Sequence, residues 1–114
     1  MIEQAILEHM KAALDVPCYL MRPENVPASF VLIEKTGGSR TNYVDRSVFA
    51  FQSYGATLLE AATLNEEVKK AADELIVLPG VSSSKRQTDY NFTNTADKHP
   101  RYQAIFEITH YEEV

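Results

Sequence analysis

The sequence is poor in residues that could cross-link a small protein. Cys18 is the single cysteine among 114 residues, so no disulfide can form within the chain. Free cysteine is usually buried and behaves as a small apolar side chain. We therefore expect Cys18 to lie in a hydrophobic core, and we expect the protein to work in a reducing compartment such as the cytoplasm.

Basic residues and long apolar runs are also few. Eleven lysines and arginines stand against sixteen acidic residues, which gives a formal net charge of -5. Proteins that read a nucleic acid sequence normally carry a basic patch that contacts phosphates. No apolar run is long enough to cross a bilayer, and no basic leader opens the chain. We therefore expect no sequence-specific nucleic-acid binding, no membrane insertion and no export by a cleaved signal, and a DNA-binding regulator is the least favoured alternative.

The common catalytic and metal-binding patterns are missing as well. The three histidines, His9, His99 and His110, do not share an element with a second ligand at metal-binding spacing. The pair Gly37 and Gly38 is not followed by the lysine and hydroxyl residue of a phosphate-binding loop. The sequence thus predicts no catalytic residue, no metal site and no cofactor.

A small enzyme is a second alternative from a different class. It would use His110 with Glu107, or residues 97–99, as acid and base in a pocket between a sheet and its helices. Specific stabilisation of the protein by a metabolite would favour it.

The apolar residues that are present, 45% of the chain, suffice for one domain that spans residues 1–114. In residues 2–14 they recur at steps of three and four, which predicts an amphipathic helix. Pro17 ends this helix. Residues 18–21 are long enough only for a short strand before a proline-containing connection.

Two apolar segments separated by a polar one follow this connection. Residues 30–33 are apolar on both alternating faces, which is typical of a strand covered on both sides or buried against a partner subunit, and they form a candidate central strand. Residues 36–43 lack periodicity and exceed the usual length of a hairpin loop, so we expect a projecting, mobile loop. Residues 47–54 return to strand, with Phe49 and Phe51 on one face.

Thr57 and Glu60 stand three residues apart in the capping-box pattern, which predicts the start of a second, longer helix. Its apolar residues gather on one arc that should lie on the sheet: Leu58, Ala61, Leu64, Val68, Ala71, Ala72, Leu75 and Ile76. Leu59 is the exception, because it falls on the polar arc. We expect Glu66 to pair with Lys70 and the helix to end at the Pro-Gly pair that follows.

The last third of the chain is predicted to hold two more strands. Residues 81–88 are too polar for a central strand and suit a solvated edge strand, and residues 89–100 read as a long polar loop. Residues 101–111 alternate apolar and polar, as a strand inside a sheet does. The predicted fold class is therefore α+β, with a mixed, mainly antiparallel sheet and the order helix, three strands, long helix, two strands.

Several aromatic residues stand in loops or at strand ends, where they cannot all enter one small core: Tyr43, Tyr54, Tyr90, Phe92, Tyr102 and Tyr111. Tyrosine commonly buries its ring and leaves its hydroxyl in water, so these residues could seal the rim of the core. Exposed aromatics also anchor partner proteins. The sequence leaves both roles open.

Two motifs in these elements resemble a known family. One strand ends in Phe51-Gln52-Ser53-Tyr54-Gly55 and is followed by a helix that contains Glu60-Ala61, and the last strand opens with Pro100-Arg101-Tyr102-Gln103. In this order, over residues 30–111, they resemble the tail terminator proteins of long-tailed bacteriophages.

The resemblance implies a small α/β subunit that forms a hexameric ring on the last ring of the tail-tube protein. Such a ring stops growth of the tube and offers a surface to head-completion proteins. The implied protein is a structural component of the virion tail, assembled in the host cytoplasm, with no chemical step and no cofactor. Another head-tail connector or completion ring protein is the nearest alternative.

A closed ring requires two different contact patches on every subunit. We expect the polar edge strand, the exposed Leu59 and residues 90–92 to contribute to subunit contacts, because they offer unpaired backbone or apolar groups outside the core. The loop of residues 36–45 is expected to dock on the tail tube or a neighbouring subunit. The candidate interface residues are Arg40, Tyr43, Arg46, Leu59, Lys85, Arg86, Tyr90 and Phe92.

Overall fold

The computed structural model describes residues 1–111 and shows an α+β fold with the predicted order of elements. The elements are α1 (Ile2–Ala13), β1 (Cys18–Tyr19), β2 (Phe30–Thr41), β3 (Val44–Tyr54), α2 (Leu58–Asp73), a 3-10 helix (Glu74–Val77), β4 (Val81–Asn91) and β5 (Arg101–Tyr111). Among the described residues, no helix is long and apolar enough to cross a membrane.

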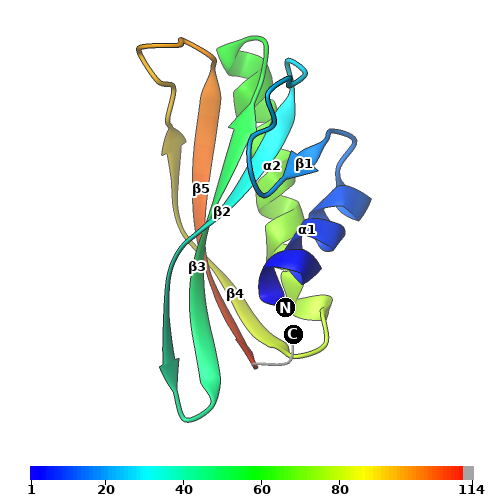
Figure 1. Ribbon diagram of the computed structural model, residues 1–114, viewed down its shortest axis with the longest axis vertical. Helices are drawn as coiled ribbons and strands as arrows, with labels where there is room; N and C mark the ends of the chain where they lie inside the picture. The colour runs from blue at the N-terminus through cyan, green and yellow to red at the C-terminus, as the bar shows by residue number, and fades with distance from the viewer. Residues whose placement is uncertain (112–114) are drawn as a thin grey trace.

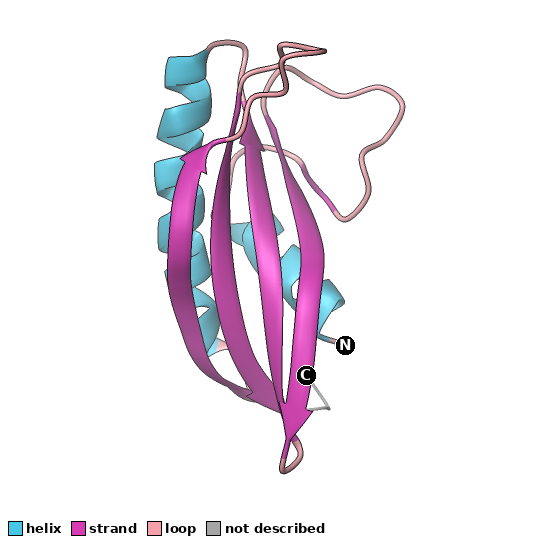
Figure 2. Cartoon of the chain, turned by 90° about the vertical axis from the view of Figure 1, so that its left-hand side faces the viewer, coloured by secondary structure: helices cyan, strands magenta, loops and turns pink. Residues whose placement is uncertain are grey.

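The five strands form one sheet in the order β1-β2-β3-β5-β4. Only β1 and β2 run parallel, and every other neighbouring pair is antiparallel. Both helices cover the same face of this sheet, and we call the other face, which carries neither helix, the open face (Figures 1 and 2). The molecule is elongated, with principal extents of 43 × 25 × 24 Å, because its longest strands run along one axis.

The hydrophobic core lies between the sheet and the two helices. Alternating residues of β3 and β5 point into it, including Phe49, Phe51 and Phe106, and their rings pack against one another. Ile6 of α1 and Val68 of α2 are completely buried against them. The predicted faces of both strands and of α1 are therefore confirmed, and Cys18 is buried in the same core as expected.

The start of α2 follows the predicted capping pattern. The backbone N–H of Glu60 donates to Thr57 Oγ1 at 3.1 Å, and the Glu60 carboxylate accepts from the backbone N–H of Ala56 at 3.2 Å. Gly55 lies against this first turn, because a Cβ atom on it would stand 2.5 Å from the backbone nitrogen of Ala61. The glycine before the helix thus permits close contact between the end of β3 and α2.

Four details of the helix and sheet differ from the predictions. Leu58 and Ile76, placed on the buried arc, are 44% and 56% exposed; Leu58 is the first residue of α2, and Ile76 lies in the 3-10 helix that follows α2. Glu66 pairs with Lys69 rather than Lys70, since Asp89 of β4 draws Lys69 to the same place. The middle strand of the sheet is β3 rather than β2, because two strands, β5 and β4, lie beyond β3 and only β1 lies beyond β2.

The polar segment after residue 35 is not a loop. Residues 36–41 continue β2, pair with β3, and reach a two-residue turn at Asn42 and Tyr43. The prediction failed because a pleated pair of strands outside the core needs no apolar alternation, and every residue from Glu34 to Thr41 is exposed. The loop predicted for residues 89–100 begins only after β4 ends at Asn91.

Candidate assembly surfaces

The β2–β3 ribbon ends in a turn that carries several of the predicted interface residues. We call residues 40–46 the hairpin tip; it lies at one end of the long axis (Figure 1). Arg40 Nε lies 3.7 Å from Asp45 Oδ1, and the Arg40 guanidinium stands 6.0 Å from the centre of the Tyr43 ring. Arg46 is also exposed, so the tip carries two arginines and one acid beside one aromatic ring.

Tyr43 occupies a conformation that few side chains adopt. Asn42 and Tyr43 form the turn with φ values of 53° and 65°. Two-residue hairpin turns with two positive φ angles strongly favour glycine at the second position, because a side chain there crowds the backbone. The Tyr43 side chain is nevertheless 82% exposed, so within this subunit it gains little burial in return.

A groove lies beside the first half of α2, near the other end of the molecule. Its volume is about 320 Å³, and most of its exposed lining is apolar. We call it the α2 groove; it is lined by Val16, Ser29, Leu59, Glu60, Thr63, Leu64 and Glu67. Leu59 is 77% exposed, as the sequence predicted, and two glutamates border it. The groove is thus apolar inside and acidic at its rim.

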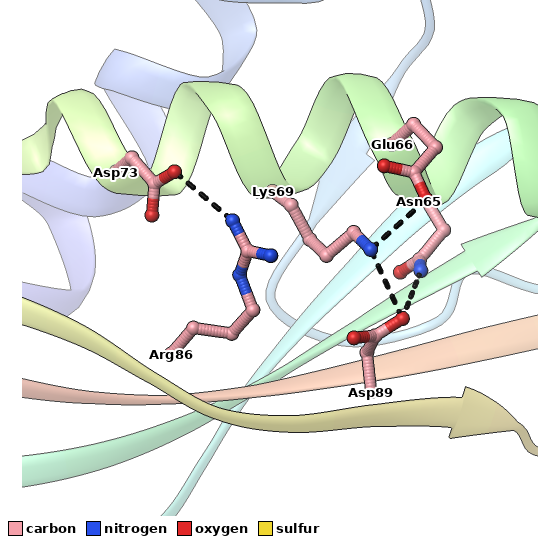
Figure 3. A network of polar contacts seen from close by, with 6 residues as sticks. All are labelled: Asn65, Glu66, Lys69, Asp73, Arg86 and Asp89. Atoms are coloured by element: carbon pink, nitrogen blue, oxygen red, sulfur yellow. Dashed lines mark hydrogen bonds and ion pairs between the residues drawn. The ribbon is translucent and has the colours of Figure 1, made fainter.

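The edge strand β4 sends Val81 into the core, and along the rest of its length it is joined to α2 by polar side chains (Figure 3). Lys69 Nζ donates to Glu66 Oε1 at 3.0 Å and to Asp89 Oδ1 at 3.1 Å. The Asn65 side-chain amide donates to the same Asp89 oxygen at 3.1 Å. Lys69 is a buried cation, only 7% exposed, and two carboxylates compensate its charge.

The pKa of Lys69 reflects two opposed effects. Burial lowers the pKa, because it disfavours the charged ammonium group. The hydrogen bonds and charges of Glu66 and Asp89 outweigh this effect and raise the pKa above its ordinary value of 10.5. Lys69 is therefore charged at neutral pH and fixes β4 to α2.

The two basic candidates of β4 face opposite sides of the sheet. Arg86 Nη2 donates to Asp73 Oδ2 at 3.1 Å, so its side chain is held against α2 of its own subunit. Lys85 pairs with Glu107 in the β4–β5 register and stands on the open face. A single basic surface on β4 is therefore not formed.

Four residues of the motifs that carry the family resemblance, Gln52, Tyr54, Arg101 and Gln103, meet on the open face of the sheet. Their hydrogen bonds form one chain, in which each residue that accepts a hydrogen bond donates the next one. Arg101 donates to the Tyr54 hydroxyl at 2.7 Å, Tyr54 to Gln52 at 3.3 Å, Gln52 to Gln103 at 2.8 Å, and Gln103 to the Tyr90 hydroxyl at 2.6 Å. This network crosses β5, β3 and β4, and such chains strengthen their members cooperatively.

Aromatic and cationic side chains cover the Tyr54 end of this network. The Phe30 and Tyr54 rings stack with centres 4.2 Å apart, and both are almost fully buried. The Arg22 guanidinium lies 5.6 Å and 5.3 Å from these two centres, and the His99 ring meets both edge-on. Tyr54 is therefore not an exposed partner-binding aromatic: its role is to seal a second small core.

The predicted aromatic pair of β4 is preorganised by the same network. The rings of Tyr90 and Phe92 meet edge to face at 5.7 Å, and each residue is 39% exposed. Gln103 holds the Tyr90 hydroxyl, and the Arg101 guanidinium lies 5.0 Å from the Phe92 ring centre. A rigid, half-exposed aromatic pair loses little side-chain freedom on binding a partner.

The residues of the enzyme alternative do not come together. His110 points into the core beside Ser47, with Nε2 and Oγ 2.8 Å apart, and Glu107 lies on the opposite face of β5. The Asp97 carboxylate accepts from the backbone N–H of His99, so it shapes its own loop. Among residues 1–111, no group of three or more histidine, cysteine or acidic side chains is placed to hold a metal ion.

The buried Ser47–His110 pair was missed in the sequence, because the two residues stand 63 positions apart. His110 Nδ1 lies 3.0 Å from the carbonyl oxygen of Tyr111, which can only accept, so Nδ1 donates. In the neutral ring Nε2 then accepts from the Ser47 hydroxyl. This arrangement satisfies two buried polar groups and joins β3 to β5.

The predicted interface residues thus fall into five separate places. Arg40, Tyr43 and Arg46 share the hairpin tip, Tyr90 and Phe92 share the end of β4, and Leu59 borders the α2 groove. Lys85 and Arg86 lie on opposite faces of the edge strand, apart from the other candidates. The groove residues Val16 and Ser29 carried no signal in the sequence, because they lie in connections that only the fold brings beside α2.

Comparison with models of known protein families gives no match for this chain, and comparison with curated proteins gives none either.

Proposed function

We propose that this chain is a structural subunit that assembles into a closed ring and caps the tail tube of a long-tailed bacteriophage. The ring would stop tube elongation and offer a surface to head-completion proteins, as tail terminator proteins do. Its place would be the virion tail, after assembly in the host cytoplasm.

One observation carries this proposal. Four of the residues that resemble the family come from two segments about fifty positions apart, and they meet in one network. Gln52 faces Gln103 and Tyr54 faces Arg101 across neighbouring strands, and their side chains are hydrogen-bonded in sequence. Residues that act as one unit in the fold support the resemblance better than scattered matches would.

The distribution of exposed apolar groups also supports self-assembly. A ring with rotational symmetry uses two different surfaces of the same subunit. Tyr43 and Leu59 are the most exposed members of two surfaces on different elements, and a third surface carries Tyr90 and Phe92. Three unlike surfaces allow two for the ring and one for the tube or the head.

The test is the molar mass of the purified protein, measured by light scattering from dilute to concentrated solution, with negative-stain electron microscopy of large species. We expect rings, and we expect added tail-tube protein from the same phage to form shorter tubes capped at one end. A protein that is monomeric at every concentration and leaves tube length unchanged is not a tail terminator. Rings that bind a portal-side connector instead of the tube would support the connector alternative.

The leading variants for this test are Leu59→Asp and Tyr90→Ala. Each changes an exposed group that contributes little to the core, so both proteins should fold. We expect at least one of them to weaken ring formation. Normal assembly by both would remove these two surfaces from the ring contacts.

A further inference from the structure

We propose that neighbouring subunits of the ring join end to end, with the hairpin tip of one subunit inserted into the α2 groove of a second copy. This inference rests on the proposed ring and names the two surfaces that meet. It is carried by the strained, exposed Tyr43 at one end of the molecule and by an apolar, acid-rimmed groove near the other.

The hairpin tip has the properties of an inserted element. Tyr43 takes φ 65° at a turn position that favours glycine, and its side chain is 82% exposed. Strained backbone positions persist where function repays the cost. A large aromatic ring that packs on another molecule accounts for both the strain and the exposure. The ladder pairs β2 with β3 as far as Thr41 and Val44, so the tip is presented on paired strands.

The α2 groove has the properties of a receiving site. Val16, Leu59 and Leu64 give it an apolar lining, and its volume of about 320 Å³ accommodates an aromatic ring. Apolar pockets with an aromatic anchor are the usual centres of protein interfaces. Leu59 has no packing role inside its own subunit, because it is 77% exposed on α2.

The charges of the two surfaces are complementary. The hairpin tip carries Arg40 and Arg46 against one acid, Asp45, whereas the α2 groove is bordered by Glu60 and Glu67 without a basic residue in its lining. Complementary charges steer association and select one orientation of the partner. The overall charge of -5 would otherwise oppose the approach of two copies.

The positions of the two surfaces favour a head-to-tail contact. The hairpin tip lies at the bottom of the molecule in Figure 1, and α2 begins near the top. Surfaces at opposite ends of a 43 Å subunit cannot meet within one chain, but they can meet between copies. Repeated head-to-tail contacts close into a ring when the rotation per subunit divides the full circle.

The sharpest test is Tyr43→Gly, because the two roles of this residue predict opposite effects. Glycine relieves the turn, so the isolated subunit should gain a few degrees in Tm, while the loss of the ring should abolish self-association in light scattering. Unchanged association by a variant with raised Tm would overturn the proposal.

Charge reversal provides a second test. Arg46→Glu and Glu67→Lys should each weaken self-association at least roughly tenfold, and the double variant should recover most of the loss, because the opposite charges face each other again. Lys70→Glu is the matched control, since Lys70 is exposed on α2 but does not line this groove. Failure of the double variant to recover any association would contradict direct contact.

Cross-linking separates this inference from the proposed function. Oxidation of a Tyr43→Cys, Leu59→Cys double variant should link subunits into covalent rings, and Cys18 will not interfere because it is buried. Tyr43→Cys with Thr95→Cys is the control, because Thr95 is exposed in a loop outside the groove. Rings that form without the Tyr43–Leu59 link would overturn this contact and leave the proposed function standing. A protein that forms no rings and caps no tubes would overturn both.

Discussion

At the scale of single residues, close contacts decide which positions tolerate change. Gly37 and Gly55 illustrate the difference: Gly37 lies within β2, and Gly55 directly follows β3. A Cβ on Gly55 would stand 2.5 Å from the Ala61 nitrogen, whereas a Cβ on Gly37 would meet nothing within 4 Å. Only the first glycine is required by packing.

We predict that Gly55→Ala destabilises the protein by roughly 1–3 kcal/mol, because the methyl group forces β3 away from the first turn of α2. Gly37→Ala is the control and should change stability by less than about 1 kcal/mol, because the added methyl group has space. Urea unfolding followed by circular dichroism measures both. Equal stability of the two variants would show that the contact at Gly55 is relaxed in solution.

The second prediction concerns Lys69 and the dependence of stability on pH. Its folded-state pKa is raised above the ordinary value of 10.5, so its contribution to stability is complete below that pH and is lost as the pH rises through the raised value. Lys69→Met should destabilise the protein by roughly 1–3 kcal/mol at neutral pH, because Asp89 loses its charged partner and keeps only the Asn65 amide.

The measurement is the difference in unfolding free energy between the wild type and Lys69→Met, followed from neutral to strongly alkaline pH. The difference should stay constant and then narrow above pH 10.5. Lys70→Met is the matched control, since Lys70 is exposed on the neighbouring position of α2. A difference that grows with pH would mean that Lys69 is held uncharged.

At the scale of elements, β4 differs from its neighbours in what holds it. Strands β3 and β5 lie inside the sheet and send phenylalanines into the core, while β4 has one strand neighbour and polar contacts to α2. Exposed ion pairs such as Asp73–Arg86 contribute at most about 1 kcal/mol. The edge strand is therefore the least firmly held of the three.

We predict that amide hydrogens of β4 exchange faster than those of β3 and β5 in the isolated subunit. Edge positions open by local unfolding, whereas central strands exchange only through larger openings. Hydrogen exchange followed by mass spectrometry or NMR measures the order. Protection of β4 equal to that of β3 in a monomeric sample would contradict it.

The same scale shows what the sequence could and could not predict. The strand of residues 101–111 and the cap at Thr57 were predicted correctly, because alternation and capping are local patterns. The ribbon of residues 36–41 was missed, because its exposed residues have no alternation and its turn carries Tyr43 where glycine would be the usual signal. The sequence therefore identified candidate residues of the hairpin tip but predicted a loop where the structure has a paired β-ribbon.

At the scale of the whole molecule, one core joins all the elements. The same cluster of buried residues contains Ile6 of α1, Cys18 of β1, Val68 of α2 and Phe106 of β5. No part of the described chain has a second core as large as this one. A single domain of this length usually unfolds in one cooperative step.

We predict one unfolding transition for the whole chain. Thermal or urea curves from far-UV circular dichroism and from tyrosine fluorescence should coincide, because helices and sheet lose the same core together. Measurement at low protein concentration keeps self-association from shifting the midpoint. Two separated transitions would show that the second small core around Phe30 and Tyr54 unfolds independently.

The sequence by itself determined the α+β class, the order of the elements, the faces of α1, β3 and β5, and the burial of Cys18, because these follow from periodicity and local chemistry. The tertiary structure alone decided which strand is central and which carboxylates pair with Lys69. It also decided that Tyr43 and the α2 groove lie near opposite ends of the molecule. These features depend on contacts between residues far apart in the chain, and no local pattern records them.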